Sequence, residues 1–503
     1  MTSRIENVEA LTADLFSDIL RDNWTKQQGQ NKNDDNKDDA DDNNVGPEIN
    51  TISVEKVVQG VLSDVYRVHL DYATSSCQMK NTEEEDTVES GSSSMNAKPV
   101  LSSSEIESAS SLSSVVESMP PADWLVKFCR PDLDLSWMCR NEAIFYSRVA
   151  PSLIATSSYS CCRLPFTIPK FLSGSDQHII LQEVTNVETY PLSEGCPPDK
   201  IDFLLRSLAA WHATCWESKV LISSSSPNNK NDEDKDKDKN AEDEDEDRLV
   251  FPTGMGQRLP PLQKEGLFIS SWQETIDHMR LQEDDKLLLD TELLDFITTL
   301  CQRLATLKLR DVHEKVHRHR VTCVHGDYHI ANWLFPAMTT TTTSGNEDKR
   351  KRKPVLVDFA TAGYGNPMID FVFFLVVSTN DDTVSESHLF LEKYYQLLIE
   401  CDPNLASRIT LETLQQEWFP WAMLGQFMIL VAYDGVCRDI VAAEQDKQKR
   451  ESQTRHFCNV NRRMILAIRS IGDWDAILSR LETTTMEERQ EAQLFCQNTA
   501  LVI

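Results

Sequence analysis

Two short segments carry residues whose types and spacing could transfer a phosphoryl group. The first is the run His325-Gly-Asp-Tyr-His-Ile-Ala-Asn332, and the second is Asp358-Phe359, which follows the apolar residues 355–357. Transfer of the γ-phosphate of ATP needs one carboxylate that orients the attacking hydroxyl and takes its proton. It also needs an amide oxygen and a second carboxylate that hold Mg²⁺ against the phosphates. Asp327, Asn332 and Asp358 are the candidates for these roles, in that order.

The neighbours of Asp327 strengthen this interpretation. A lone Asp would more simply be a loop carboxylate held by backbone amides, but here the pattern H-x-D-x-x-x-x-N is followed by D-F, which is the catalytic half of the kinase signature. Gly326 suits a loop that needs unusual backbone angles. His325 is interpreted as a hydrogen-bonding support of the loop, because the carboxylate already fills the proton-acceptor role.

A cation for the ATP phosphates is expected earlier in the chain. Lys127 lies in the strand-like run 124–129, where a Lys among apolar residues is costly unless it is paired. Glu142 lies on the next expected helix, 136–149. A strand Lys and a helix Glu form the ion pair that positions the ATP phosphates in kinases. The alternative is a surface Lys on an edge strand.

The loop that would cover the phosphates has a weak signal. The run from Val58 to Arg67 has a single glycine, not the three of a glycine-rich loop. Gly60 could allow close approach of the backbone, and Ser63 could offer a hydroxyl and an amide to phosphate. An ordinary β-turn is the alternative interpretation.

The elements that must position these groups change in type along the chain. The apolar spacing predicts a helix at 8–24, strands at 52–54, 57–70, 124–129, 168–172 and 178–184, and helices at 136–149, 200–217, 272–280 and 285–309. Helices are expected to dominate after Ile369. Residues 332–335 and 354–358 are expected to form the two arms of a hairpin, which would bring Asn332 and Asp358 to one Mg²⁺ site.

Composition excludes some functions. The net charge is −30, and three acidic runs at 26–48, 79–120 and 230–248 contribute −4, −6 and −6, so the remainder is acidic as well. An acidic chain argues against a nucleic-acid partner. The most apolar stretch, 418–433, is interrupted by polar residues and glycine and is shorter than the ~20 residues of a membrane span, so a buried helix and no membrane partner are expected.

The cysteines and one histidine pair need separate interpretations. The 13 cysteines form no C-x-x-C pair, which indicates reduced thiols and a cytoplasmic location. His313-Glu-Lys-Val-His317 matches the H-E-x-x-H helix of zinc proteases. That interpretation is rejected, because the flanking residues are strongly basic and the chain next enters the strand that leads to Asp327, not a helix that could supply a third ligand.

These pieces together resemble the aminoglycoside phosphotransferase/choline kinase superfamily, in particular its ecdysteroid-kinase-like branch. The resemblance covers roughly residues 52–474 apart from the inserts. It rests on the segments already described and on Leu208-Ala-Ala-Trp-His-Ala213, Trp216, Gly363, Pro367 and Asp370. Gly326, where protein kinases usually have Arg, favours the small-molecule branch. His329 and Ala331 stand where this branch often has Trp and a second Asn.

The resemblance implies an α+β, two-lobed protein-kinase-like fold with a small β-rich N-lobe and a larger helical C-lobe. Residues 1–49 would form a helix and an acidic linker, residues 50–185 the N-lobe with a disordered insert at about 75–120, and residues 186–503 the C-lobe with inserts at about 223–248 and 339–353. Segment 181–184, with Glu183, would lie against adenine. Asp370 would brace the catalytic loop.

The sequence therefore predicts transfer of phosphate from ATP, with Mg²⁺, to a hydroxyl of a small molecule. Aromatic residues of the helical lobe, which are Trp272, Trp418, Phe419 and Trp421, could line an acceptor pocket or could fill the core. A nucleotide-binding or scaffold module without activity is the main alternative. A protein kinase fits poorly, because only a dozen residues separate Asp358 from Asp370 and leave little room for an activation loop.

Overall fold

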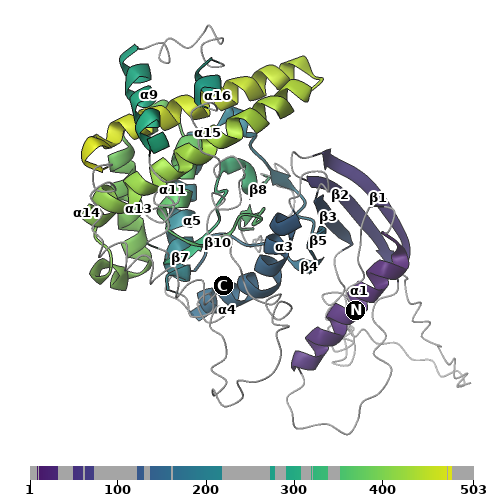
Figure 1. Ribbon diagram of the computed structural model, residues 1–503. Coiled ribbons are helices and arrows are strands. Elements are labelled where there is room, and N and C mark those ends of the chain that lie inside the picture. Colours follow the sequence, from purple (N-terminus) through teal and green to yellow (C-terminus); the bar gives the residue numbers. More distant parts are fainter. Residues whose placement is uncertain are drawn as a thin grey trace, which may run out of the picture. The chain divides into compact units, whose positions relative to one another are not determined.

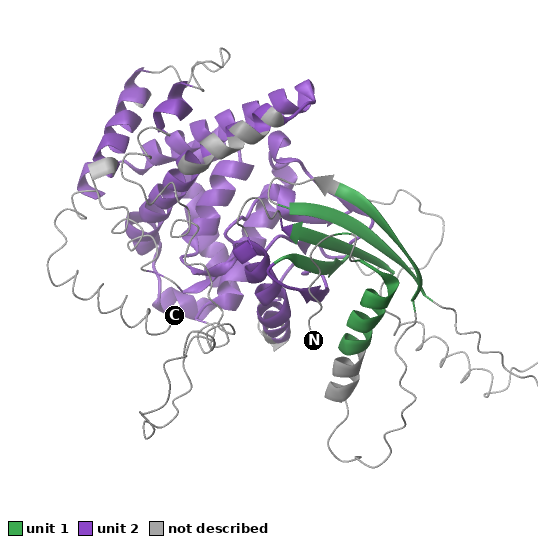
Figure 2. Cartoon of the chain, turned by 45° about the vertical axis from the view of Figure 1, so that its right-hand side comes forward, with its two compact units in different colours: residues 1–128, 177–183 green, residues 129–176, 184–503 purple. Residues whose placement is uncertain are grey.

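The computed structural model describes residues 8, 11–31, 49–59, 63–72, 122–129, 136–159, 163–217, 272–277, 291–306, 319, 321–337, 352–472 and 474–477. The acidic inserts, Gly60 and the His313–His317 pair lie outside these residues. The chain divides into two compact units (Figure 2): unit 1 comprises residues 1–128 and 177–183, and unit 2 comprises residues 129–176 and 184–503. The domain bounds expected from the sequence remain a prediction.

Unit 1 is built on antiparallel strands. Helix α1 (Ala13–Asn31) precedes β1 (Ile49–Gln59), β2 (Ser63–Tyr72), β3 (Asp123–Cys129) and β5 (His178–Gln182), and the strands lie side by side in the order β1-β2-β3-β5. Side chains alternate across β3, where Trp124, Val126 and Phe128 are buried. Lys127 therefore points to the opposite face of the sheet from this apolar row.

Unit 2 opens with α3 (Ser136–Ile144), which continues through the π-helical turn η3 (Phe145–Val149) into α4 (Ala150–Tyr159). The short elements that follow are β4 (Phe171–Gly174), β6 (Val187–Glu188) and η4 (Leu192–Glu194). Helices α5 (Pro198–Cys215) and α9 (Thr291–Thr306) come next, with a helical segment at 272–277 between them. Figure 1 shows how these elements are arranged within the unit.

The second half of unit 2 holds the segment that carries Asp327, Asn332 and Asp358, followed by the long helices. The strands are β7 (Thr322–Val324), β8 (Trp333–Pro336), β9 (Val355–Leu356) and β10 (Gly363–Gly365), with η7 (Ile330–Asn332) before β8. The helical elements are α11 (Met368–Ser378), α12 (Asp381–Ser385), α13 (Ser387–Cys401), η8 (Pro403–Ser407), α14 (Leu411–Thr413), η9 (Leu414–Trp418), α15 (Phe419–Ala443) and α16 (Lys447–Ile471).

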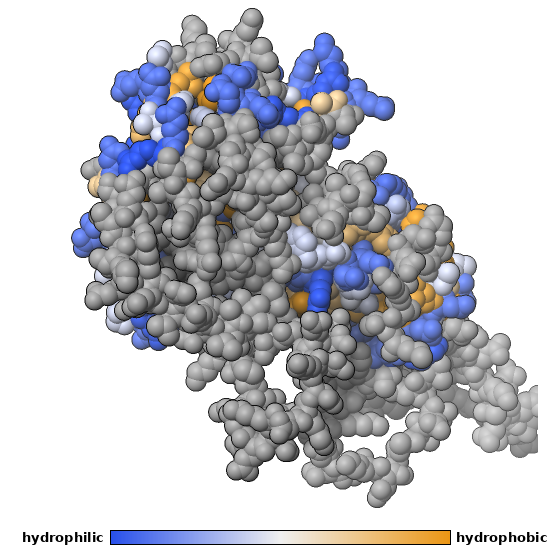
Figure 3. All heavy atoms as spheres, viewed as in Figure 1, coloured by the Kyte–Doolittle hydropathy of each residue, from blue (hydrophilic) through white to orange (hydrophobic). Residues whose placement is uncertain are grey.

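The core of unit 2 lies where α5, α11, α13, α15 and α16 pack on one another. Almost every side chain of α11 is buried, which explains its nearly continuous apolar sequence. Trp272, Trp418, Phe419 and Trp421 are all buried as well. No helix in the described part of the chain is long and apolar enough to cross a membrane. In the view of Figure 3, the described surface is mostly hydrophilic, with hydrophobic residues in small groups.

Several expectations from the sequence were confirmed and others were wrong. The hairpin is confirmed, because β8 and β9 pair antiparallel with Trp333 opposite Leu356. The first helix is shifted to 13–31 from the expected 8–24. For the helix expected at 136–149, the apolar spacing predicts Trp137, Ile144, Phe145 and Val149 as the core-facing residues. Phe145 and Val149 are fully buried, whereas Trp137 and Ile144 are only half-buried. The buried face of α3 also includes the polar residues Asn141 and Glu142. Periodicity missed this part of the face because polar residues occupy it.

The expectation of reduced thiols was wrong at one pair. Cys129 and Cys139 form a disulfide, with their Cα atoms 6.2 Å apart. Their spacing of ten residues matches no recognised disulfide or metal pattern, so no signal in the sequence indicated this bond. Six other described cysteines, at positions 196, 215, 301, 323, 401 and 458, take no part in a disulfide.

Candidate active site

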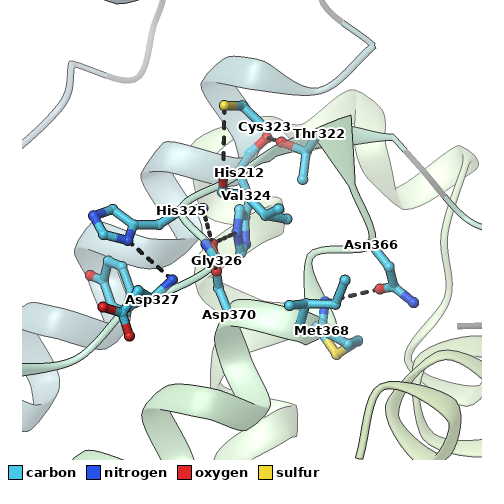
Figure 4. Close-up of polar contacts among 12 residues, drawn as sticks. His212, Thr322, Cys323, Val324, His325, Gly326, Asp327, Asn366, Met368 and Asp370 are labelled. Atoms are coloured by element: carbon cyan, nitrogen blue, oxygen red, sulfur yellow. Dashed lines mark hydrogen bonds and ion pairs between the residues drawn. The ribbon is translucent and has the colours of Figure 1, made fainter. Parts of the chain in front are cut away.

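Asp370 anchors the loop that carries Asp327. Its side chain, fully buried on the first turn of α11, accepts hydrogen bonds from the backbone amides of His325 and Gly326, each at 2.7 Å. His212 of α5 lies 3.2 Å from the same carboxylate and 2.7 Å from the hydroxyl of Tyr394. Figure 4 shows the side chains of Asp370 and His212 meeting beneath the loop. Two helices therefore fix the backbone immediately before Asp327.

Gly326 is required at its position for two reasons. Its φ angle is +79°, which L-residues with a side chain adopt rarely. A Cβ atom at this position would lie 2.4 Å from the carbonyl oxygen of Thr361, a distance that real Cβ atoms do not reach. The hydroxyl of Thr361 also donates to the carbonyl of His325 at 3.1 Å. The loop and the segment after Asp358 are thus packed backbone against backbone.

His325 is placed as a neutral support of the loop. Its Nε2 lies 3.0 Å from the carbonyl oxygen of Val357, to which it donates, and its Nδ1 accepts from the backbone amide of Asp327 at 3.3 Å. Burial lowers the pKa of His325, and this outweighs the opposing effect of the carboxylates of Asp370 and Asp327. The ring therefore links the loop to the strand end that carries Asp358.

Asp327 is held by two side chains of its own loop. Asn332 donates from Nδ2 to the carbonyl oxygen of Asp327 at 2.8 Å and to its Oδ2 at 3.2 Å, and His329 Nε2 lies 3.3 Å from Oδ1. Burial would raise the pKa of Asp327, but His329 first, then His325 and Asn332, lower it to about 2. The side chain keeps about a third of its surface exposed, so an ionised carboxylate faces outward from the loop.

Asn332 and Asp358 are brought together by the hairpin. The backbone amide of Val357 donates to the carbonyl oxygen of Asn332 at 3.0 Å, which places Asp358 one residue from this link. Because Nδ2 of Asn332 donates to Asp327, its Oδ1 is left as the atom that could bind a cation. Asp358 has a φ angle of +64°, a conformation that is uncommon outside glycine and recurs at functional sites.

Phe359 and α3 hold Asp358 from the other side. The ring of Phe359 stacks on Phe145 with centroids 3.9 Å apart. Asn141 donates to the carbonyl oxygens of Ala360 at 3.0 Å and Ala362 at 2.9 Å. Sequence analysis missed Asn141, because its partners lie about 220 positions away. A polar residue on a buried helix face suggests a buried hydrogen-bond partner. That signal can be used only once the buried face of the helix is known.

Glu142 is almost fully buried on the same helix. Burial raises the pKa of Tyr146, and the charges of Glu142 and Asp358 raise it further, so both carboxylates lie near this ring. Lys127 belongs to unit 1, and its pairing with Glu142 remains a prediction. Among the described residues, no group of three or more His, Cys, Asp or Glu side chains could hold a metal ion. The assignment of Asn332 and Asp358 as Mg²⁺ ligands remains a prediction.

Two predicted nucleotide contacts lie in unit 1. Ser63 is buried at the start of β2. Glu183 follows β5, and Arg67 binds its carboxylate from Nε at 2.8 and 2.9 Å. The backbone amide of Glu183 donates to the carbonyl oxygen of Asp123 at 3.0 Å. The carboxylate of Glu183 is therefore engaged within unit 1, and its backbone carbonyl is the group that could meet a nucleotide.

The fold and this loop define a kinase-like protein of the α+β class, with a small antiparallel sheet and a larger helical part. A family model described as the ecdysteroid kinase-like family matches residues 130–406, which is more than half of the chain. The chain belongs to this family. The match begins after Lys127, so neither this residue nor the loop at Gly60 and Ser63 lies within it.

One solved structure with a similar chain is that of the streptomycin–ATP–APH(2″)-IIa ternary complex. The similarity covers 80% of this chain and 92% of that chain, with 13% sequence identity and a TM-score of 0.30. No curated protein matches the sequence.

Proposed function

We propose that this chain is an ATP- and Mg²⁺-dependent phosphotransferase that moves the γ-phosphate of ATP to a hydroxyl of a small molecule. The observation that carries the proposal is the buried loop in which Asn332 binds Asp327 directly, while the hairpin sets Asp358 beside them. Membership in a kinase-like family supports the same class of reaction.

Asp327 is proposed as the catalytic carboxylate. Its low pKa keeps it ionised at neutral pH, so it can accept a hydrogen bond from the acceptor hydroxyl and align that oxygen with the γ-phosphate. A carboxylate with this pKa is a weak base, so orientation is its main contribution. The proton then transfers late, when the attacking oxygen has become acidic. His325 and Asp370 keep the loop in place without contacting substrate.

The remaining residues would hold the nucleotide and its cation. Oxygen atoms of Asn332 and Asp358 fit the preference of Mg²⁺ for hard ligands, and the bound ion would neutralise charge on the phosphates. Lys127, oriented by Glu142, would bind the phosphates, with the backbone at Gly60 and Ser63 over them. Glu183 would lie on the segment against adenine.

The partner is proposed to be a small hydroxylated molecule that binds in the helical unit, with neither nucleic acid nor membrane as a partner, and the location is proposed to be cytoplasmic. The buried aromatic residues at 272, 418, 419 and 421 are assigned to core packing, since their burial leaves little surface for stacking on a ligand.

The test is transfer of label from γ-labelled ATP into a metabolite extract by the purified full chain. Wild type should label at least one small molecule, and Asp327→Ala should lower that rate by roughly a thousandfold while still binding Mg-ATP. Asp199→Ala is the matched control, because this carboxylate is 70% exposed and should leave the rate unchanged. Near wild-type transfer by Asp327→Ala would disprove the assignment.

A second outcome distinguishes the main alternative. If wild type binds Mg-ATP, as measured by calorimetry, but labels no molecule in extracts from several sources, a nucleotide-binding module without transfer activity becomes the better interpretation. Loss of Mg-dependent binding in Asp358→Ala would then still locate the cation at the hairpin.

A further inference from the structure

The disulfide between Cys129 and Cys139 lies next to residues of the proposed site. Cys129 follows Lys127 by two positions at the end of β3. Cys139 is on α3, where it precedes Asn141 by two positions and Glu142 by three. Residues three apart on a helix share a face, so the sulfur bond and the carboxylate of Glu142 are carried by the same side of α3.

Through α3, the bond reaches the segment that carries Asp358. Asn141 is held by the carbonyl oxygens of Ala360 and Ala362, and the residue after Asp358, Phe359, stacks on Phe145 in the turn that continues the helix. A shift of α3 would therefore disturb both Glu142 and the backbone after Asp358. In the disulfide-bonded form, all of these contacts are made.

Two other cysteines show that proximity alone does not account for this bond. Cys215 and Cys323 are both fully buried and lie within hydrogen-bonding reach of each other, yet both are free. In Cys129–Cys139, by contrast, Cys129 is half-buried and only Cys139 is fully buried. Cys129 is therefore the more exposed residue of the pair, and we take it as the point of attack for a reductant.

We propose that Cys129–Cys139 is a regulatory disulfide that holds α3 in the position the site needs, so that reduction weakens nucleotide binding and phosphate transfer. This inference rests on the proposed function for its transfer arm. Disulfides in reducing compartments are usually transient and redox-sensing, so the bond can belong to a cytoplasmic protein. The partner in the exchange is a small protein or molecule that carries two neighbouring thiols.

The exchange balances as a two-electron transfer. One thiolate of the dithiol attacks Sγ of Cys129, the more exposed residue of the pair, which breaks the Cys129–Cys139 bond and forms a mixed disulfide. Cys139 leaves as a thiolate and takes up a proton. The second thiol of the reductant, after losing its proton, attacks the mixed disulfide and releases Cys129. The chain gains two thiols, and the reductant becomes a disulfide.

The experiment uses the full chain in oxidised form and after treatment with dithiothreitol, with the state of Cys129 and Cys139 verified by alkylation and mass measurement. Dissociation constants for Mg-ATP and transfer rates are measured in both states. Reduction is expected to weaken nucleotide binding and slow transfer roughly tenfold, because small displacements of positioning groups carry costs of this size or larger. Reoxidation should restore both.

Variants identify the responsible pair. Cys129→Ser removes the half-buried partner without placing a hydroxyl in the core, so it should fold, behave like the reduced form and no longer respond to dithiothreitol. Cys196→Ser, a free and partly exposed thiol, is the matched control and should respond like wild type. If Cys129→Ser still responded to the reductant, or if wild type bound and transferred equally in both states, the inference would be wrong.

The two proposals fail in different ways. If the affinity for Mg-ATP depended on the redox state but the chain transferred no phosphate, the transferase function would be refuted and the regulatory role of the disulfide would stand. If transfer proceeded equally in both states, the proposed transferase function would stand and the regulatory role of the disulfide would be refuted.

Discussion

Polar residues are arranged differently in the loop of unit 2 that carries Asp327 and on the sheet of unit 1. In the loop, Asp370 is fully buried and accepts from two backbone amides. On the sheet, Arg67 binds Glu55 and Glu183, and His69 meets Asp123 with half of its ring exposed. Removing a partner from a buried network leaves an unsatisfied group, whereas water replaces a partner on the surface. We therefore expect substitutions in the loop to lower the free energy of unfolding strongly, and substitutions on the sheet to lower it only slightly.

The largest effect is expected at Gly326. Gly326→Ala should lower the free energy of unfolding by roughly 3 kcal/mol or more and abolish transfer, because the new Cβ would meet the Thr361 carbonyl oxygen at 2.4 Å and the backbone would have to move. Gly472→Ala is the matched control: its φ angle of +92° is also positive, but no atom lies within 4 Å of the added Cβ. Gly472→Ala should lower the free energy of unfolding by about 1 kcal/mol. If the two variants lost equal free energy of unfolding in urea, the backbone conformation alone, without packing, would explain the effect of Gly326→Ala.

The next effect concerns Asp370. Asp370→Asn replaces one acceptor oxygen with an NH₂ group that faces a backbone amide, so a loss of about 2 to 4 kcal/mol in unfolding free energy is expected. Transfer should fall as well, since the loop before Asp327 loses a support. Asp202→Asn is the control, because that carboxylate is half-exposed beside Lys393 and Arg206 and should cost less than about 1 kcal/mol. Similar losses for the two variants would contradict the comparison.

The sequence predicted the parts of this architecture that depend on local patterns. Alternation of apolar residues predicted β3, and the run before Asp358 predicted an arm of the β8–β9 hairpin, because the period-two pattern and the turn between the strands are local. The family resemblance pointed to Asp370 as a brace of the loop. The strand signals are local to the strands that they describe, whereas the role of Asp370, whose partners lie about 45 positions away, came from the resemblance alone.

Contacts between distant segments could not be predicted in this way. Nothing near Asn141 indicates that it binds Ala360 and Ala362, because these carbonyl groups are backbone atoms that carry no sequence signature. The disulfide of Cys129 with Cys139 has no sequence signature either, since a spacing of ten residues matches no recognised pattern. For the same reason, the buried face of this helix was predicted only in part: Phe145 and Val149 are buried as expected, but Asn141 and Glu142 are polar residues whose burial only their partners explain.

A third prediction uses pH to compare the units. Burial lowers the pKa of His456 on α16 to about 4, and the charges of Arg463 and His329 lower it further. The folded state therefore binds fewer protons than the unfolded state between pH 6.5 and 4, so stability is full above pH 6.5 and falls as the pH drops to about 4. His456→Gln should remove a loss of roughly 3 kcal/mol over this window. His69→Gln, on the exposed face of unit 1, is the control, and a similar change in its pH profile would contradict the assignment.

The smallest effect is expected for the ion pair of Arg67 and Glu183. A double-mutant cycle with Arg67→Met and Glu183→Gln should give a coupling energy of about 1 kcal/mol or less in unfolding experiments, because 39% of the Arg67 side chain is exposed and water can replace either partner. A cycle on His69 and Asp123, which are both more exposed, should give a still smaller value.

The same variants test what Glu183 contributes to the nucleotide. Its carboxylate already binds Arg67, so the backbone of this residue, and not the side chain, is the group left to meet adenine. Glu183→Gln should then change the dissociation constant for ATP by less than about threefold, which corresponds to less than 1 kcal/mol. A tenfold or larger loss, with stability unchanged, would show that the carboxylate itself recognises the nucleotide. A substitution on the surface of unit 1 would then affect function as strongly as one in the buried loop, and the contrast between the two regions would no longer hold.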